Sequence, residues 1–342
     1  MSVLGIGSEL SEALSREVIT YTYGKRPEHV FGRIVFSMTL VVRNPHLPDG
    51  QRAALAVIDE LRQMIPDETY RWWWTREGTR PSRVAKKPPP PAAELLHAAG
   101  EAPDAFTVWL WDSDNPDYDA PAHYLKLRYP LRIGTYETPV GTLQLTVPLD
   151  WLVRQEDGWA LRTFVALCTR MKPRFGYAGF AMTSPYDNGA TQWNLQVAYP
   201  LLRRSPGINC AIGNHLIMTL GRLPDDEGGM TTIDWLTAAD AHALDLCGGE
   251  PALREAFGEP DFLVYFTGGG VVVRAGPHPQ IGNLDAGITL PHYGHVAHFF
   301  RPARFLDFTK MVNLAYGSDD SNMNKDIMLA NQKEWLTRFD EM

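Results

Sequence analysis

The sequence is poor in cysteine and has neither a secretion signal nor a membrane span. Its three cysteines, Cys168, Cys210 and Cys247, are an odd number, lie far apart and form no C-x-x-C pair. This usage argues against a disulfide framework and is typical of a reducing compartment. The first residues lack a basic region followed by an apolar run, and no run approaches the roughly 20 apolar residues of a membrane span. We therefore expect a cytoplasmic protein that does not bind membranes.

The chain also lacks an excess of positive charge. It has 32 Lys and Arg residues against 40 Asp and Glu residues, which gives a formal net charge of −8. An acidic protein is repelled by phosphate backbones and by anionic lipid, so we expect no direct binding of nucleic acid. The same charge suits a basic protein partner, such as a nuclease, whose cleft must attract phosphates.

Motifs for the common enzyme chemistries are missing too. There is no G-x-S-x-G nucleophile elbow, no G-x-x-x-x-G-K-[ST] phosphate loop and no H-E-x-x-H zinc motif. Gly268–Gly270 leads into the apolar run Val271–Val273, which is typical of a hairpin turn rather than a phosphate site. We therefore expect a protein that uses no cofactor and is not an enzyme.

One enzymatic alternative stays open. His292, His295 and His298 recur every three residues, a spacing at which neighbours on a helix can share a metal, as in a metal-dependent hydrolase. No Cys, Asp or Glu falls at ligand spacing in the same stretch. Packing or surface histidines are the simpler interpretation, and we predict no metal site.

Tryptophans beside basic residues raise a second alternative. Trp72–Trp74 stand within a stretch, residues 71–87, that holds six Arg and Lys residues. Aromatic rings and cations together can bind single-stranded nucleic acid. Consecutive tryptophans on a strand must point to both faces, so at least one should lie in the core. A solvated basic loop is the favoured interpretation.

Strand and helix patterns are mixed along the chain. Strands are expected at 34–42, 70–75, 106–111, 124–129, 142–147, 177–182, 262–267 and 271–274, and helices at 49–65, 92–99, 157–171, 192–202, 234–247, 251–257, 291–300 and 327–339. In 124–129 and 142–147 polar and apolar residues alternate, which predicts an antiparallel sheet with one solvated side. The mixture favours an α+β fold, with a mixed, largely antiparallel sheet or sheets flanked by helices.

The same patterns suggest how the chain is divided. We expect an N-terminal segment over 1–30, one α+β domain over 31–306, and a C-terminal tail over 307–342 that ends in a helix. The rhythm of the domain allows two similar halves, 31–174 and 175–306.

Carboxylates gather in two loops, and we predict them as the residues that bind a partner. They are Asp112, Asp114, Asp117 and Asp119 in the first loop, and Asp225, Asp226 and Glu227 in the second. The carboxylates of such a cluster repel one another unless a cation or a basic partner offsets their charge. The first loop departs from the EF-hand pattern, because Asp117 and His123 stand where Gly and Glu are required. A merely solvated loop is the alternative.

Several motifs in the second half of the chain resemble those of one family. In chain order they are Phe175–Gly179, Ile233–Thr237, Cys247–Gly249 with Leu253, Val271–Gly282, and Tyr293–Val296 with Arg301-Pro302. Together they resemble the type VI secretion immunity family, whose members are immunity proteins to VRR-Nuc-type nuclease toxins. The resemblance is clearest over 175–305 and extends through Pro148–Leu152 to residue 33. Asp234 departs from the family pattern, in which Asn precedes Trp-Leu-Thr.

The resemblance implies a non-enzymatic inhibitor. Its partner would be a cognate type VI effector, a DNase with an acidic metal site in a basic cleft, and the immunity protein would act in the cytoplasm by occluding that cleft. An effector of another class stays open. The motifs are rich in Gly, Pro and Trp, so they are expected to determine turns and packing rather than the toxin-binding surface.

Overall fold

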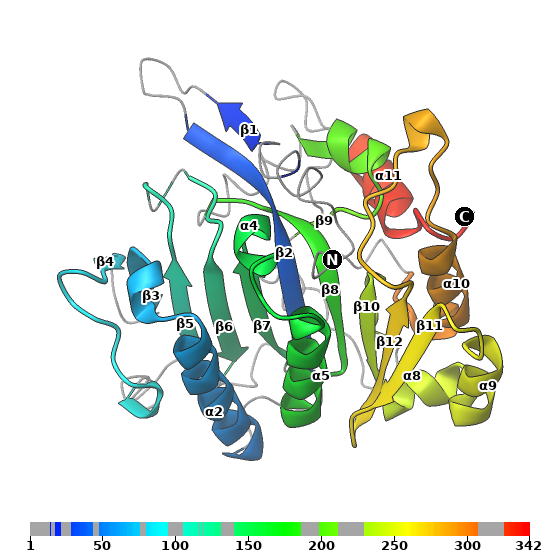
Figure 1. The fold of residues 1–342 in the computed structure, drawn as a ribbon, viewed down its shortest axis with the longest axis horizontal. Coiled ribbons are helices and arrows are strands. Elements are labelled where there is room, and N and C mark those ends of the chain that lie inside the picture. Colours follow the sequence, from blue (N-terminus) through cyan, green and yellow to red (C-terminus); the bar gives the residue numbers. More distant parts are fainter. Residues whose placement is uncertain are drawn as a thin grey trace.

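The chain folds around one large sheet (Figure 1). In the computed structural model, the described residues are 14, 18–21, 29–43, 48–75, 80–94, 105–115, 117, 119–130, 140–185, 198–210, 229–306 and 325–342. Within them the sheet has 12 strands in the order β11-β12-β10-β8-β2-β7-β6-β5-β3-β4, with β1 paired to β2 and β9 to β8. The β8–β9 pair is parallel and the others are antiparallel. The predicted α+β class, with a mixed, largely antiparallel sheet, is confirmed.

The strands and helices agree well with most of the predicted segments. The strands are β1 Val18–Tyr21, β2 His29–Arg43, β3 Trp72–Thr75, β4 Ser82–Arg83, β5 Ala105–Trp111, β6 Tyr124–Pro130, β7 Val140–Val147, β8 Phe175–Thr183, β9 Asn209–Cys210, β10 Leu236–Asp240, β11 Phe262–Phe266 and β12 Gly270–Ala275. The helices are α2 Pro48–Met64, η1 Asp67–Thr69, α4 Leu149–Leu152, α5 Trp159–Met171, α8 Ala241–Leu246, α9 Gly249–Ala256, η2 Leu284–Ala286, α10 Pro291–Phe299, η3 Arg301–Ala303 and α11 Lys325–Leu336. Of the predicted helices 92–99 and 192–202, the described parts, 92–94 and 198–202, are helical. No helix in these ranges combines the length and the apolar character needed to cross a bilayer.

The centre of the sheet is the pair of β2 and β8. β2 has 15 residues and pairs with β7 along its other edge, so residues 36–41 are flanked by strands on both sides. Strands from 31–174 continue the sheet beyond β7, and strands from 175–306 continue it beyond β8. The two predicted halves therefore meet at β2–β8 within one continuous sheet, and their similarity stays a prediction.

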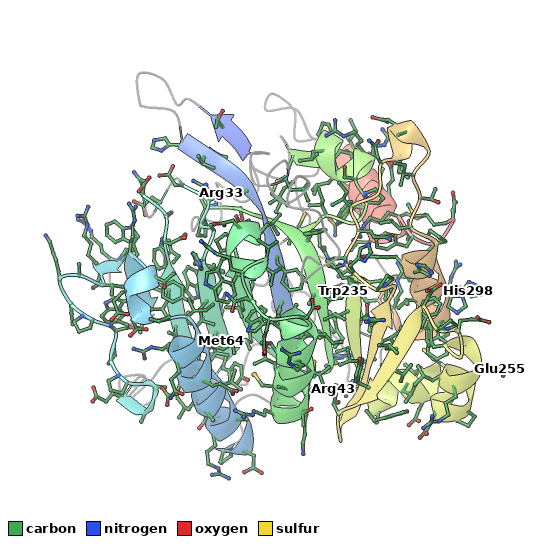
Figure 2. The ribbon with its side chains drawn as sticks, in the orientation of Figure 1. Arg33, Arg43, Met64, Trp235, Glu255 and His298 are labelled. Carbon is green, nitrogen blue, oxygen red and sulfur yellow. The ribbon has the colours of Figure 1, made fainter. Side chains whose placement is uncertain are left out.

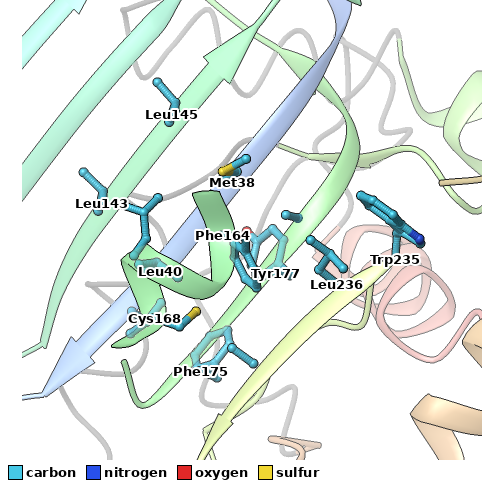
Figure 3. Close-up of a cluster of buried hydrophobic side chains, with 14 of the residues drawn as sticks. Met38, Leu40, Leu143, Leu145, Phe164, Cys168, Phe175, Tyr177, Trp235 and Leu236 are labelled. Atoms are coloured by element: carbon cyan, nitrogen blue, oxygen red, sulfur yellow. The ribbon is translucent and has the colours of Figure 1, made fainter. Parts of the chain in front are cut away.

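Helices α2 and α5 lie side by side on one face of the sheet, with α5 over its centre (Figure 1). Phe164 and Cys168 of α5 are buried against Leu40 of β2 (Figure 3). Gly176 of β8 allows this close packing, since a Cβ there would come 2.5 Å from Cδ2 of Leu40. Burying each large apolar side chain contributes about 1.5–3 kcal/mol. Cys210 is also buried.

The predicted helix over 234–247 is wrong in its first half. Residues Leu236–Asp240 form β10, which lies between β8 and β12. Leu236 to Ala239 are all buried, so the segment has the continuous apolar character of an inner strand, which periodicity does not separate from a buried helix. The helix α8 begins only after Asp240, whose carboxylate caps it by accepting a hydrogen bond from the amide of Ala243 at 2.8 Å.

The prediction of a solvated face on β6 and β7 is also wrong. Every residue of β7 is buried, and Lys126 on β6 is only 4% exposed. Its Nζ lies 3.8 Å from the ring centroid of Trp109. Burial lowers the pKa of Lys126 well below its usual value, and neighbouring Arg128 adds to this effect. Alternation of polar and apolar residues shows that the two faces of a strand differ in polarity. It does not show whether the polar face is exposed to solvent or covered by other parts of the chain.

Candidate functional site

The first acidic loop is held to the fold by two of its own carboxylates. The Asp112 carboxylate accepts hydrogen bonds from the amides of Ala122 at 2.9 Å and His123 at 3.0 Å, and its Oδ2 lies 2.9 Å from Nδ1 of His123. Asp119 accepts hydrogen bonds from the amides of Asn115 at 2.8 Å and Val30 at 3.3 Å. These two carboxylates therefore fix the loop rather than face a partner.

The other two carboxylates of the loop lie on the surface. Asp114 and Asp117 are exposed, and Asp114 forms an ion pair with Arg71. The loop also contacts the basic stretch through Trp72, whose Nε1 donates a hydrogen bond to the carbonyl of Ser113 at 3.0 Å. The four carboxylates are therefore close in sequence but differ in role, since two hold the loop and two are exposed. The charge of Asp114 is offset by Arg71. Asp225, Asp226 and Glu227 lie outside the described residues.

Two of the three tryptophans of β3, Trp72 and Trp73, contact the basic residues beside them. Trp73 is buried, which confirms that at least one of the three lies in the core. Its Nε1 donates a hydrogen bond to the carbonyl of Lys87 at 2.6 Å, and the guanidinium of Arg83 lies 5.0 Å from the ring centroid of Trp72. The cations therefore stack on the protein's own rings.

Two of the three histidines of α10, His292 and His295, make packing contacts, and His298 is exposed. The ring of His292 lies 5.3 Å from that of Phe262. His295 lies 5.0 Å from the same ring, and its Nε2 is 2.8 Å from the carbonyl oxygen of Ala256. Over the described ranges, no three His, Cys, Asp or Glu side chains are grouped so that they could hold a metal ion. The contacts explain His292 and His295 as side chains that join α10 to α9 and β11.

A strongly acidic surface lies at the other end of the sheet. We call it the α9 acidic surface, and it consists of the exposed residues Asp245, Glu250, Glu255, Glu259 and Asp261. Arg254 is the only Arg or Lys between residues 241 and 266, and its Nε donates to Glu250 at 2.7 Å. Glu255 lies on the outer rim of the molecule in Figure 2. Of the other four carboxylates, Asp261 lies 3.5 Å from Nε2 of His292 on α10, and no Arg or Lys of the same segment pairs with Asp245, Glu255 or Glu259.

Exposed apolar side chains stand close to these carboxylates in the sequence. Leu246 of α8 is 39% exposed, and Leu263 and Phe266 of β11 are 38% and 48% exposed. The guanidinium of Arg254 lies 5.2 Å from the ring centroid of Phe266. Apolar side chains with a charged rim are typical of a protein-binding surface. Sequence reasoning missed this surface, because its acidic residues are spread over 17 positions and do not form a run.

A groove lies between helix 198–204, the 284–289 loop and α11. Its volume is about 1460 Å³. Glu334 in its wall pairs with Arg203 at 2.9 Å and accepts a hydrogen bond from the Tyr199 hydroxyl at 3.1 Å. Asp340 pairs with Arg304. These charges are satisfied within the protein, and the groove is a weaker candidate than the α9 acidic surface.

The motifs of the second half contact one another in the core. Trp235 donates a hydrogen bond from Nε1 to the carbonyl of Gly276 at 3.1 Å, and its amide donates to Asp234 at 2.8 Å. The Tyr293 hydroxyl accepts a hydrogen bond from the amide of Gln280 at 3.1 Å. The motifs therefore join β10, the 276–282 loop and α10, as expected of residues that determine the fold.

Comparison with known proteins decides the family. The family TsiV, described as type VI immunity for VRR-NUC, matches residues 55–339. The chain belongs to this TsiV family. The solved structure titled Pseudomonas aeruginosa T6SS protein PA0821 is similar to the TsiV chain over 97% of this chain and 90% of that one, with a TM-score of 0.78 and 20% identity. At this identity the likeness shows the fold alone. No curated protein matches significantly.

Proposed function

We propose that this chain is an immunity protein that binds a VRR-NUC nuclease effector of a type VI secretion system and neutralises it. The family match over residues 55–339 carries the proposal. The net charge of −8 supports it, because a nuclease needs a positive cleft to attract phosphates, and such a cleft is complementary to an acidic inhibitor.

Inhibition needs only occupancy of the effector's cleft. Exposed carboxylates, such as those of the α9 acidic surface, would compete there with the phosphates of DNA. Exposed apolar side chains beside them, such as Phe266, would add the buried area that a specific complex requires. The proposed site of action is the cytoplasm, where the DNA is.

Co-expression tests the proposed function. Expressing the VRR-NUC effector of the same gene cluster in Escherichia coli should arrest growth, and this chain, expressed without an added secretion signal, should restore it. The two proteins should also co-elute on gel filtration. An effector that acts on the cell wall serves as the control and should not be relieved. If growth is not restored and no complex forms, the proposed function is wrong.

The acidic loop offers a separate prediction about the rate of binding. We propose that Asp114 and Asp117 attract the basic effector, so replacing both with Asn should slow association about 2- to 10-fold at low salt and flatten its salt dependence. Asp112 and Asp119 stay unchanged because they hold the loop. Asp150→Asn, on the exposed surface of α4, is the control. Unchanged kinetics in stopped-flow measurements would show that the loop is only solvated.

A further inference from the structure

The two edge strands of the sheet differ in how they are protected against pairing with another strand. An exposed edge strand offers unpaired backbone groups to any other strand, and proteins usually protect such edges with short strands, lysine or proline. β4, at one end, has only two residues. Pro81 precedes it, and Lys86, Lys87 and Pro88–Pro91 follow it. This end carries all three forms of protection.

β11, at the opposite end, carries none of them (Figure 1). Its sequence, Phe-Leu-Val-Tyr-Phe, contains no charged residue and no proline. Leu263 and Phe266 are exposed. The strand is therefore an apolar edge on which another strand can pair.

The hydrogen bonds at its two ends show which backbone groups of β11 are open. The carbonyl of Asp261 accepts from the amide of Gly276, and the amide of Thr267 donates to the carbonyl of Gly270, both at 3.0 Å. In an antiparallel pair the bonded residues alternate, so residues 263 and 265 also bond to β12. The amides and carbonyls of Val264 and Phe266 then point away from the sheet, where the described residues place no further strand.

We infer that β11 takes up an extended basic segment of the effector as an added strand. The inference rests on the proposed function and names the surface that performs it. Main-chain hydrogen bonds to residues 264 and 266 would hold the segment, and its side chains would contact Leu263 and Phe266. The carboxylates of the α9 acidic surface, which directly precede β11 along the chain, would select a basic segment.

Charge decides between a basic partner and a second copy of the chain. A symmetric pair of β11 strands would bring the same surface of both copies together. Each copy would contribute Glu255, Glu259 and Asp261, which lie within seven residues of β11, where Arg254 is the one Arg or Lys of residues 241–266 and His292 Nε2 lies 3.5 Å from Asp261. Like charges across an interface oppose association, whereas a basic strand is attracted.

Hydrogen exchange on the unmodified complex tests the inference directly. The amides of Val264 and Phe266 should exchange quickly in the free protein and at least 10-fold more slowly in the complex with the effector nuclease, because an added strand bonds them. The amide of Thr267, already bonded to Gly270, should change less. Equal exchange of residues 264 and 266 in the free and bound protein would overturn the proposal.

A proline variant provides the second test. Val264→Pro removes an outward-pointing amide, together with a side chain that packs partly against the core, and should weaken effector binding at least 100-fold in calorimetry. Val264→Thr, which keeps the amide, and Arg83→Pro, at the outward position of β4, should bind like the unmodified chain. The double variant Glu255→Lys, Glu259→Lys leaves the β11 sequence unchanged and should weaken effector binding at least 10-fold. This variant tests the proposal if Val264→Pro does not fold.

The outcomes separate the inference from the proposed function. If the unmodified chain binds the effector and folded Val264→Pro binds equally well, strand addition is wrong while the immunity function stands. If the unmodified chain does not bind the effector, both are wrong. If light scattering shows a dimer that Val264→Pro converts to a monomer, β11 pairs with a second copy and the inference is overturned.

Discussion

Replacing Asp234 with Asn should make the protein about 2–4 kcal/mol more stable at pH 8 and leave its stability at pH 4 nearly unchanged. Burial raises the pKa of Asp234 from 3.8 to about 7, against the opposing effect of hydrogen bonds from the Trp235 amide and Asn209. A group whose pKa is higher in the folded protein contributes stability below its unfolded pKa. That contribution is lost as the pH rises through the folded pKa, here between about 4 and 7.

Asn keeps this position neutral at every pH. Urea unfolding at several pH values between 4 and 8 measures the effect. The free energy of unfolding should fall with pH in the unmodified protein and fall less in Asp234→Asn. Asp150→Asn, at an exposed position, should change it by less than about 0.5 kcal/mol. Parallel pH curves for the protein and Asp234→Asn would contradict the prediction.

Replacing Gly270 with Ala should destabilise the protein by about 3 kcal/mol or more. Gly270 begins β12 and pairs with Asp240 of β10. A Cβ there would lie 2.1 Å from the carbonyl oxygen of Ala239 and 2.8 Å from the Cα of Asp240. Both are backbone atoms of an inner strand, so no side chain can move to make room, and β12 must shift away from β10.

Thermal and urea unfolding of Gly270→Ala measure the cost. Gly258→Ala is a matched control, because the nearest atom to its Cβ would be the carbonyl oxygen of Arg254 at an ordinary 3.4 Å. The control should change stability by less than about 1 kcal/mol. A Gly270→Ala protein as stable as the control would show that β10 and β12 are not packed as described.

Much of the fold could be predicted from the sequence because its signals are local. The alternation in 34–42 predicts β2, and Gly268–Gly270 between two apolar runs predicts the β11–β12 hairpin. β10 could not be predicted, since a strand buried on both faces has no alternation. The order of the strands was also out of reach, because it depends on pairing between distant residues. That order is what makes β11 an edge.

The candidate site shows the same division. The four carboxylates of 112–119 are recognisable in the sequence as an acidic loop. Their charge alone does not show that Asp112 and Asp119 accept hydrogen bonds from backbone amides. The α9 acidic surface was missed because its residues become neighbours only through the fold. The histidine spacing placed His292 and His295 within reach of each other on one helix, while the aromatic contacts that explain them come from Phe262 of β11.

The central position of β2 has a consequence for how the protein is made. β2 leaves the ribosome early, but its long-range partners β7 and β8 follow only after about 100 and 130 residues. At roughly 5–20 residues per second of synthesis, an apolar strand waits about 5–25 seconds for its neighbours. Pairing between such distant segments is slow to form. Under the immunity function proposed above, this delay favours a stock of finished protein over synthesis that begins after a toxin arrives.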